Sequence, residues 1–291
     1  MTFSQRDVEA AARLIAGSER AIALTGAGIS VDSGIPAFRG FCGYGGPQSD
    51  RALSESARAL SESARASRET SGRETSGRGA QGLWDRYDPM EYAHIDAFLA
   101  NPERVWEMLR ELGAIIEGSE PNAGHRALAD LEGMGRLRAV ITQNVDGLHQ
   151  RAGSKEVIEF HGSGQRLVCL AGHGPFQRAV IRADRFPPRC PECGAVLKPD
   201  VVLFGEPIPE QAARCAQDHI LRTDLVLVVG TTAEVAPAGD IPFAARRRGA
   251  RVIEVNLEPT HLTGGVANLT LLGSSTEVLP RIVREVEKQA P

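Results

Sequence analysis

The sequence has no run of apolar residues long enough to span a lipid bilayer, and residues 1–7 lack the apolar core of a signal peptide. It also has no large excess of charge of one sign, because the formal net charge is −4. That balance gives no overall basic signal for nucleic acid or anionic lipid. We expect a cytoplasmic protein with no membrane contact and no direct nucleic-acid binding.

Cysteine is scarce as well, and an odd total of five argues against a disulfide framework. Cys42 and Cys215 are expected to be lone thiols. The other three fall in one segment, where Cys190 and Cys193 have zinc-knuckle spacing. One alternative is a degenerate module that has lost its metal and is held by packing. We expect instead a structural zinc bound by Cys169, His173, Cys190 and Cys193.

A complete dinucleotide fingerprint is missing too. The predicted strand Ala21–Thr25 runs into Gly26 and Gly28, but Val31 stands where the third glycine is required. No strand ending in an acidic residue follows at the usual distance, which disfavours a hydride-transfer dehydrogenase. The Gly-x-Gly pair still lets backbone amides approach a phosphate at a helix N-terminus. The alternative is a tight strand-to-helix turn.

What the chain does contain is polar residues directly after predicted strands. Residues 138–141 form an apolar, β-branched strand that is followed by Gln143, Asn144 and Asp146. Residues 157–160 form another strand, which His161 follows. Ligands bind at the carboxyl ends of strands in open α/β sheets. Together these side chains predict a polar pocket with a candidate general base.

The order of elements predicts an α/β fold, with further strands at residues 224–229, 251–256 and 268–272 and helices between them. We expect a Rossmann-like parallel sheet with helices on both faces, built from residues 1–40, 119–166 and 200–291. A smaller helical module at 81–118 and a zinc-ribbon-like cysteine module at 167–199 complete a single domain over residues 1–291.

Tandem repeats fill residues 48–80: residues 51–57 recur at 58–64, and residues 68–72 recur at 73–77. The segment has no aromatic residue and little apolar bulk, so it cannot bury enough surface to offset the entropy of ordering it. We expect a disordered insertion that adds inert length rather than an interaction loop.

Several motifs carry a family resemblance. They are Gly26-Ala27-Gly28-Ile29-Ser30, then Ser33-Gly34-Ile35-Pro36 with Phe38-Arg39, then Gln143-Asn144-Val145-Asp146-Gly147-Leu148-His149, and Phe160-His161-Gly162. In this order and spacing the chain resembles the sirtuins, which are NAD-dependent protein-lysine deacylases, over most of its length. We expect a member of bacterial type. The pattern Pro121-Asn122-x-x-His125 also matches, with His125 expected as a structural residue at a helix start.

The resemblance implies an enzyme that removes acetyl or other apolar acyl groups from the lysine side chains of partner proteins or peptides. NAD is the co-substrate, and the products are deacylated lysine, nicotinamide and O-acyl-ADP-ribose. His161 is assigned as general base on a ribose hydroxyl, a role that suits an imidazole titrating near neutral pH. Asn144 and Asp146 are assigned to orienting the ribose and nicotinamide.

The resemblance also assigns residues that contact NAD and the peptide. The peptide would pair with a strand made by Val202, Leu203, Phe204 and Gly205, through backbone hydrogen bonds; the alternative is a simple edge strand. Phe38 and Arg39 would hold a loop over the cofactor, and Thr231, Thr232, Asn256 and Glu258 would bind its adenosine half. The full set for NAD is Gly26, Ala27, Gly28, Ile29, Phe38, Arg39, Gln143, Asn144, Asp146, Gly230, Thr231, Thr232, Asn256, Leu257 and Glu258.

Four features depart from the family pattern. Ala37 stands before Phe38-Arg39, where many members carry Asp. Gly172 breaks the first of two Cys-x-x-Cys pairs, and His173 follows one residue later. The repeats lie in the region that the family uses as a mobile cofactor-binding loop. Leu109 and Leu112 stand where members that prefer acidic acyl groups carry Tyr and Arg, which favours acetyl or longer apolar acyl groups.

Two alternatives to deacylation remain open. The same pocket could hydrolyse NAD or transfer ADP-ribose to protein. The chain could also be a non-catalytic NAD-binding or protein-binding module, inactivated by the insertion and the broken cysteine pair. The intact set of Gln143, Asn144, Asp146 and His161 argues against this second alternative.

Overall fold

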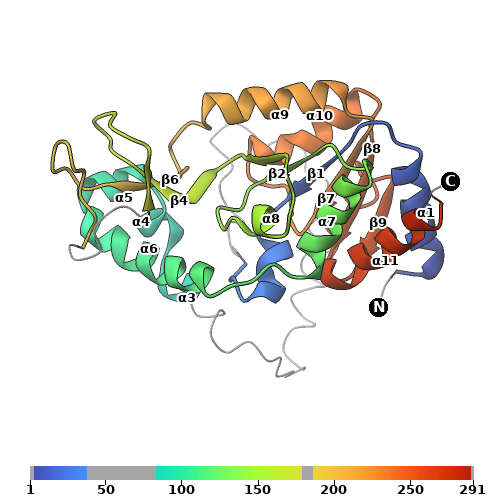
Figure 1. Cartoon of the computed structure of the whole chain (residues 1–291), viewed down its shortest axis with the longest axis horizontal. Coiled ribbons are helices and arrows are strands. Elements are labelled where there is room, and N and C mark those ends of the chain that lie inside the picture. The colour runs from blue at the N-terminus through green and yellow to red at the C-terminus, as the bar shows by residue number, and fades with distance from the viewer. Residues whose placement is uncertain (1–2, 38–82, 179–185, 290–291) are drawn as a thin grey trace, which may run out of the picture.

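A six-stranded parallel sheet with the order β3-β2-β1-β7-β8-β9 forms the centre of the molecule (Figure 1). The computed structural model describes residues 3–37, 83–178 and 186–289, so our expectations for Phe38, Arg39 and residues 48–80 lie outside it. The strands are β1 (Ala21–Thr25), β2 (Ala139–Thr142), β3 (Val157–Glu159), β7 (Leu225–Val229), β8 (Arg251–Asn256) and β9 (Leu269–Leu272).

The strand order changes direction between β1 and β7: β2 and β3 follow β1 on one side, and β8 and β9 follow β7 on the other. β1 and β7 themselves pair in parallel over their full length. Both strands are buried at every position, as expected for apolar strands that helices cover on both faces. Such a reversal in strand order leaves a crevice at the carboxyl ends of the two strands, where open α/β sheets bind their ligands.

Helices cover both faces of this sheet. One face packs against α1 (Gln5–Ala16), α7 (Ala123–Gly133) and α11 (Ser275–Glu287). The other packs against α9 (Glu210–Arg222), the short 3-10 helix η3 (Ala238–Asp240) and α10 (Ile241–Arg247). The helices form where apolar residues recur with helical spacing; α1 also begins with a capping box between Ser4 and Asp7.

A smaller part of the molecule lies to the left in Figure 1. It contains α3 (Leu83–Arg86), α4 (Pro89–Tyr92), α5 (Ile95–Ala100), α6 (Pro102–Glu117) and an antiparallel sheet of β4 (Gly162–Val168), β5 (Phe176–Gln177) and β6 (Lys198–Val201). Trp106 is buried in its core, and its Nε1 donates to the Leu197 carbonyl at 2.8 Å. That bond joins the helices to the cysteine segment. The limits that we predict for the separate parts remain predictions.

The structure confirms the predicted strands of the large sheet. The segment at residues 202–205, which follows the last strand of the small sheet, differs from our expectation. β6 ends at Val201, and of residues 202–205 only Phe204 forms a bridge, with His94. Neither the expected peptide-pairing strand nor the alternative edge strand is therefore present as a continuous strand. The N–H groups of Val202, Leu203 and Phe204 donate instead to the His161 carbonyl, the Glu206 carboxylate and the Ala93 carbonyl. Of the helices among the described residues, none is both long enough and apolar enough to cross a bilayer.

Candidate active site

Glycine residues bring the carboxyl ends of β1 and β7 into contact. Gly28 lies in the 3-10 helix η1 (Ala27–Ser33), and Gly230 follows β7 with a φ of +61°. The Gly28 N–H donates to the Gly230 carbonyl at 2.8 Å. A Cβ on Gly28 would lie 2.7 Å from the Gly230 backbone, and a Cβ on Gly230 would lie 2.4 Å from the Ile29 nitrogen. Any side chain at either position would therefore force the two strand ends apart.

The hydrogen bonds of this turn change our expectation that its backbone amides approach a phosphate. The N–H groups of Gly26, Gly28 and Ile29 already donate to backbone carbonyls of Val229, Gly230 and Gly26. These three amides are therefore committed to the fold and are not free donors for a phosphate. The element that follows is a 3-10 helix of seven residues rather than an α-helix. The glycines are required here for close backbone packing.

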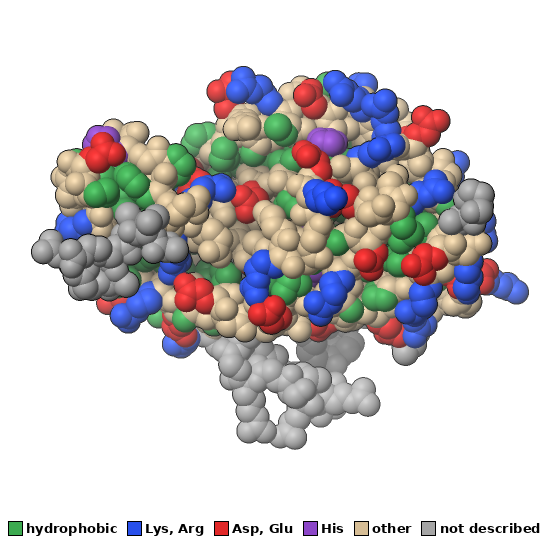
Figure 2. Space-filling view, viewed as in Figure 1, with side chains coloured by type: hydrophobic (Ala, Val, Ile, Leu, Met, Phe, Trp, Pro, Cys, Tyr) green, Lys and Arg blue, Asp and Glu red, His purple; other side chains and the backbone are tan. Residues whose placement is uncertain are grey.

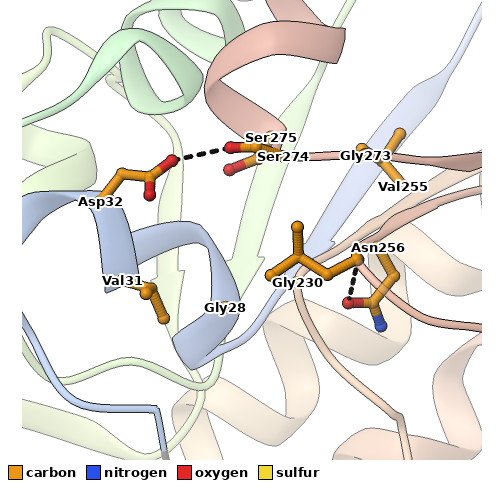
Figure 3. Close-up of a pocket in the computed structure, with 10 residues that line it drawn as sticks. Gly28, Val31, Asp32, Gly230, Val255, Asn256, Gly273, Ser274 and Ser275 are labelled. Atoms are coloured by element: carbon orange, nitrogen blue, oxygen red, sulfur yellow. Dashed lines mark hydrogen bonds between the residues drawn. The ribbon is translucent and has the colours of Figure 1, made fainter. Parts of the chain in front are cut away.

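A pocket opens at this meeting point of β1 and β7 (Figure 3). Four residues of the predicted cofactor set line it: Gly28, Gly230, Asn256 and Leu257. Its lining also includes residues that we did not predict, which are Val31, Asp32, Val255, Gly273, Ser274 and Ser275. Gly273 and Ser274 directly follow the predicted strand at 268–272, so the rule that ligands bind at strand ends could have found them.

Asp32 closes one side of this pocket. Its Oδ2 accepts hydrogen bonds from Ser274 Oγ at 2.7 Å and from Thr276 Oγ1 at 2.6 Å. The first of these bonds is drawn in Figure 3. The two bonds tie η1 to the start of α11, and this contact holds the pocket wall in place.

Gln143 and Asn144 leave the carboxyl end of β2 and reach across β1. Gln143 Nε2 donates to Thr231 Oγ1 at 3.0 Å, and Asn256 Nδ2 donates to the Thr231 carbonyl at 3.2 Å. Asn144 Nδ2 donates to the Gly26 carbonyl at 3.2 Å. Predicted residues that follow β1, β2, β7 and β8 are therefore joined by hydrogen bonds at the carboxyl ends of these strands.

Two residues of the predicted cofactor set show no such connection among the described residues. Thr232 is exposed, and its hydroxyl donates to Glu234 at 3.2 Å. Glu258 is also exposed to solvent. Leu257 lines the pocket with 53% of its surface exposed, so it presents apolar surface to a ligand.

His161 lies between β3 and β4, partly buried beside Gln143. Its Nδ1 is 3.2 Å from the Gln143 carbonyl oxygen. Because a carbonyl can only accept, Nδ1 carries the ring proton and Nε2 keeps its lone pair. Burial lowers the pKa of His161, while the hydrogen bond to Gln143 works in the opposite direction. A neutral imidazole with a free lone pair is what a general base requires.

Asp146 is buried, and both of its carboxylate oxygens accept hydrogen bonds within the protein. Ser30 Oγ donates to Oδ2 at 2.7 Å, and the Leu148 N–H donates to Oδ1 at 2.9 Å. Burial raises the pKa of Asp146, and these hydrogen bonds oppose the rise. In this arrangement Asp146 acts on Ser30, whose hydroxyl also accepts from Asn144 Nδ2 at 3.1 Å.

His125 completes this buried chain. Its Nδ1 accepts the Asn122 N–H at 3.3 Å in a capping box, as expected for a residue at a helix start. Its Nε2 therefore carries the proton and lies 3.3 Å from Ser30 Oγ. Burial lowers the pKa of His125 to about 4, so the ring is neutral at pH 7. We missed the contact with Ser30 because the two motifs lie 95 residues apart.

Cys169, His173, Cys190 and Cys193 form a cluster, and their ligand atoms all lie within 4.8 Å of one another. The Sγ atoms of Cys169 and Cys193 are 3.5 Å apart, and His173 Nδ1 is 3.6 Å from Cys190 Sγ. Zinc–sulfur bonds of about 2.3 Å in a tetrahedron place sulfur atoms about 3.8 Å apart. The four side chains fit a structural zinc.

The longer spacing between Cys169 and His173 is accommodated by the backbone. Gly172 has a φ of +89° and Gly174 a φ of +97°, a region that glycine enters without strain. The Cys169 N–H donates to the His173 carbonyl at 3.1 Å, which closes the turn. His173 Nε2 lies 3.9 Å from Glu192 Oε2, so Nδ1 faces the cluster and Nε2 faces a carboxylate.

The strand order, the pocket and the polar strand ends together define a nucleotide-binding α/β protein with a candidate general base. The chain belongs to the Sir2 family, whose model matches residues 69–237. It is 40% identical over 278 residues to NAD-dependent protein deacylase 2 from Pyrobaculum aerophilum, which covers 96% of this chain and 95% of that protein. This and other similar relatives are archaeal, so our expectation of a bacterial-type member is wrong.

Solved structures of the family share the fold over nearly the whole chain. A Sir2 homologue in complex with NAD is 36% identical, with a TM-score of 0.78 and coverage of 97% of this chain and 94% of that one. Sir2Af2 bound to a myristoylated histone peptide is 32% identical, with a TM-score of 0.69 and 98% of both chains covered.

Proposed function

We propose that the chain removes acyl groups from protein lysine side chains with NAD as co-substrate, and that His161 is the general base. The observation that carries this proposal is the hydrogen bond from His161 Nδ1 to the Gln143 carbonyl. It leaves Nε2 with its lone pair at the edge of the sheet where the predicted cofactor residues meet. The deacylase relative, the NAD complex and the acylated-peptide complex support the same activity.

In the proposed reaction NAD supplies the ribose carbon, which loses nicotinamide and gains a bond to the acyl carbonyl oxygen. His161 Nε2 takes the proton of a ribose hydroxyl, whose oxygen then attacks the acyl carbon. Water then releases free lysine and leaves the acyl group on ADP-ribose. Asn144 orients the ribose, and Asp146 acts through Ser30 to hold Asn144. Gln143, Thr231 and Asn256 position the cofactor beside the pocket.

Apolar acyl groups are the substrates that the small part supports. Leu109 is buried among apolar residues, and Leu112 packs against the same group. Neither position offers a cation or hydroxyl to an acidic acyl group. The partners would be acyl-lysine proteins or peptides that contact residues 202–205. Direct nucleic-acid binding is not part of the proposal, because acidic and basic side chains are interspersed over the face in Figure 2 and the net charge is −4.

A zinc ion bound by the cysteine cluster would stabilise the fold without taking part in the chemistry, since all four ligands are protein side chains. A cytoplasmic location fits this cluster, because its thiols remain available to a metal in a reducing compartment.

Turnover of NAD with an acetyl-lysine peptide, followed by mass spectrometry of all products, tests the proposal. We expect deacetylated peptide, nicotinamide and acetyl-ADP-ribose in equal amounts. His161→Ala should lower the rate at least a hundredfold, whereas His219→Ala on α9, outside the candidate site, should not change it. Nicotinamide and free ADP-ribose without deacylation of acetyl or longer acyl peptides would support NAD hydrolysis instead. ADP-ribosylated protein would indicate the transferase, and no turnover would indicate a non-catalytic module.

A further inference from the structure

Three buried polar side chains lie beneath the candidate active site without a role so far: Thr25, Thr142 and His149. They are 0%, 3% and 1% exposed. Thr25 and Thr142 are the last residues of β1 and β2 and are directly paired in register, so their side chains point to the same face of the sheet. His149 lies in α8 (Leu148–Arg151), which follows the polar motif.

The three side chains form one continuous hydrogen-bonded chain. Thr25 Oγ1 donates to Thr142 Oγ1 at 2.9 Å, and His149 Nε2 is 2.9 Å from Thr25 Oγ1. Because Thr25 has only one hydroxyl hydrogen, its oxygen accepts from His149, and Nε2 carries the ring proton. Thr142 Oγ1 then accepts a second hydrogen bond, from the backbone N–H of Asn144 at 3.1 Å. The chain therefore ends on Asn144.

Asn144 is consequently held twice by buried hydroxyl groups. Its backbone N–H is fixed by Thr142, and its side-chain Nδ2 donates to Ser30 Oγ at 3.1 Å. The two hydrogen-bonded chains also touch, because the rings of His125 and His149 meet edge to face with 4.9 Å between centroids. Apolar side chains of similar size would fill the space under Asn144 but would leave its backbone amide without an acceptor.

We propose that His149, Thr25 and Thr142 are positioning residues that fix the backbone of Asn144 at the end of β2, so that its side chain is pre-oriented for the nicotinamide ribose. The orienting role of Asn144 rests on the proposed function. The fixed backbone does not, because it follows from the hydrogen bonds alone. None of the three touches substrate; each acts through the next. Fixed geometry of this kind raises the rate of the chemical step, since a displacement of about 1 Å can lower that rate about a hundredfold.

Two substitutions at Thr142 distinguish the contribution of its hydroxyl from that of its methyl group. Thr142→Val keeps the shape and removes the acceptor for Asn144, whereas Thr142→Ser keeps the acceptor and removes a methyl group. We expect amide hydrogen exchange over residues 143–148, measured without NAD or peptide, to be about tenfold faster in Thr142→Val and near wild type in Thr142→Ser. Unchanged exchange in Thr142→Val would overturn the proposal, whatever the activity of the wild type.

Kinetics then tests the functional part. If the wild type deacylates, Thr142→Val should lower kcat about tenfold with little change in KM for NAD, and Thr142→Ser should restore kcat to within about twofold. Thr223→Val is the matched control, because it removes a buried hydroxyl at the opposite end of the sheet. It should lower the melting temperature without lowering kcat. A loss of kcat that follows melting temperature across all three variants would show a purely structural role. A wild type without deacylation would contradict the proposed function alone.

Discussion

At the scale of single residues, hydrogen-bond partners decide which atom can react. The Gln143 carbonyl makes His161 Nδ1 a donor, and the Asn122 N–H makes His125 Nδ1 an acceptor. Two imidazoles of the same protein are thereby assigned opposite tautomers. The first keeps a lone pair on Nε2, as the proposed base requires, and the second donates to Ser30.

The pH dependence of the reaction follows from His161. Burial lowers its pKa below the ordinary value of 6.5, so more than half of the rings are neutral at pH 6.5. We expect kcat/KM for NAD to remain high at pH 6.5 and to fall only as the pH drops through the lowered pKa. A rate profile between pH 5 and 8 measures this, and an acid limb centred above pH 6.5 would contradict the assignment of His161 as base.

Sequence patterns found some of these residues and missed others for a physical reason. Asn144, Asp146 and His161 could be predicted because each directly follows an apolar strand. Ser30, His125 and His149 act through contacts with residues 95 to 124 positions away in the sequence. Periodicity and spacing describe only neighbours along the chain, so such pairings become visible only in the folded structure.

At the scale of elements, the predicted strands and long helices match closely because their apolar periodicity is strong. The segment at residues 202–205 is different, because only the family resemblance assigns it as a strand. Three of its N–H groups pair with the Glu206 carboxylate and with carbonyls of two other segments. The sequence also did not show that the amides of Gly26, Gly28 and Ile29 donate to backbone carbonyls. A Gly-x-Gly turn has the same sequence whether its amides bind a ligand or the backbone of a neighbouring segment.

The cysteine segment offers a test at the same scale. His173→Ala should lose zinc, since three thiolates leave one coordination position open, whereas His173→Cys should keep it by supplying a fourth thiolate. Zinc retained during competition with a chelator, measured by mass spectrometry of the metal, compares the variants with the wild type. We expect at least a tenfold loss of affinity for His173→Ala. Equal affinity would show that His173 is not a ligand.

At the scale of the whole molecule, the two buried imidazoles make stability depend on pH. Burial lowers the pKa of His149 to about 3 and that of His125 to about 4. Below pH 6.5 the unfolded chain binds protons at both residues while the folded chain does not, so protons favour unfolding. Each residue then contributes a loss of about 1.4 kcal/mol per pH unit. Asp146, whose pKa is raised, opposes this loss of stability, whereas His161, whose pKa is lowered, adds to it.

We therefore expect the free energy of unfolding to fall as the pH is lowered from 6.5 to 4.5. Urea denaturation at pH 7, 6 and 5 measures the slope. A free energy of unfolding that does not change between pH 7 and pH 5 would show that the two rings are protonated as easily in the folded state as in the unfolded chain.

The contact between Gly28 and Gly230 has a consequence for the order of folding. These residues are about two hundred positions apart in the sequence, and the central pair of strands that carries them is equally distant along the chain. Strand pairing at such separation forms slowly and late. During synthesis, β7 must therefore leave the ribosome before Gly230 can pack against Gly28 and complete the pocket. A nascent chain can hold β1 and β2 before the pocket exists, so a ligand of this pocket can stabilise only a molecule in which β7 has joined the sheet.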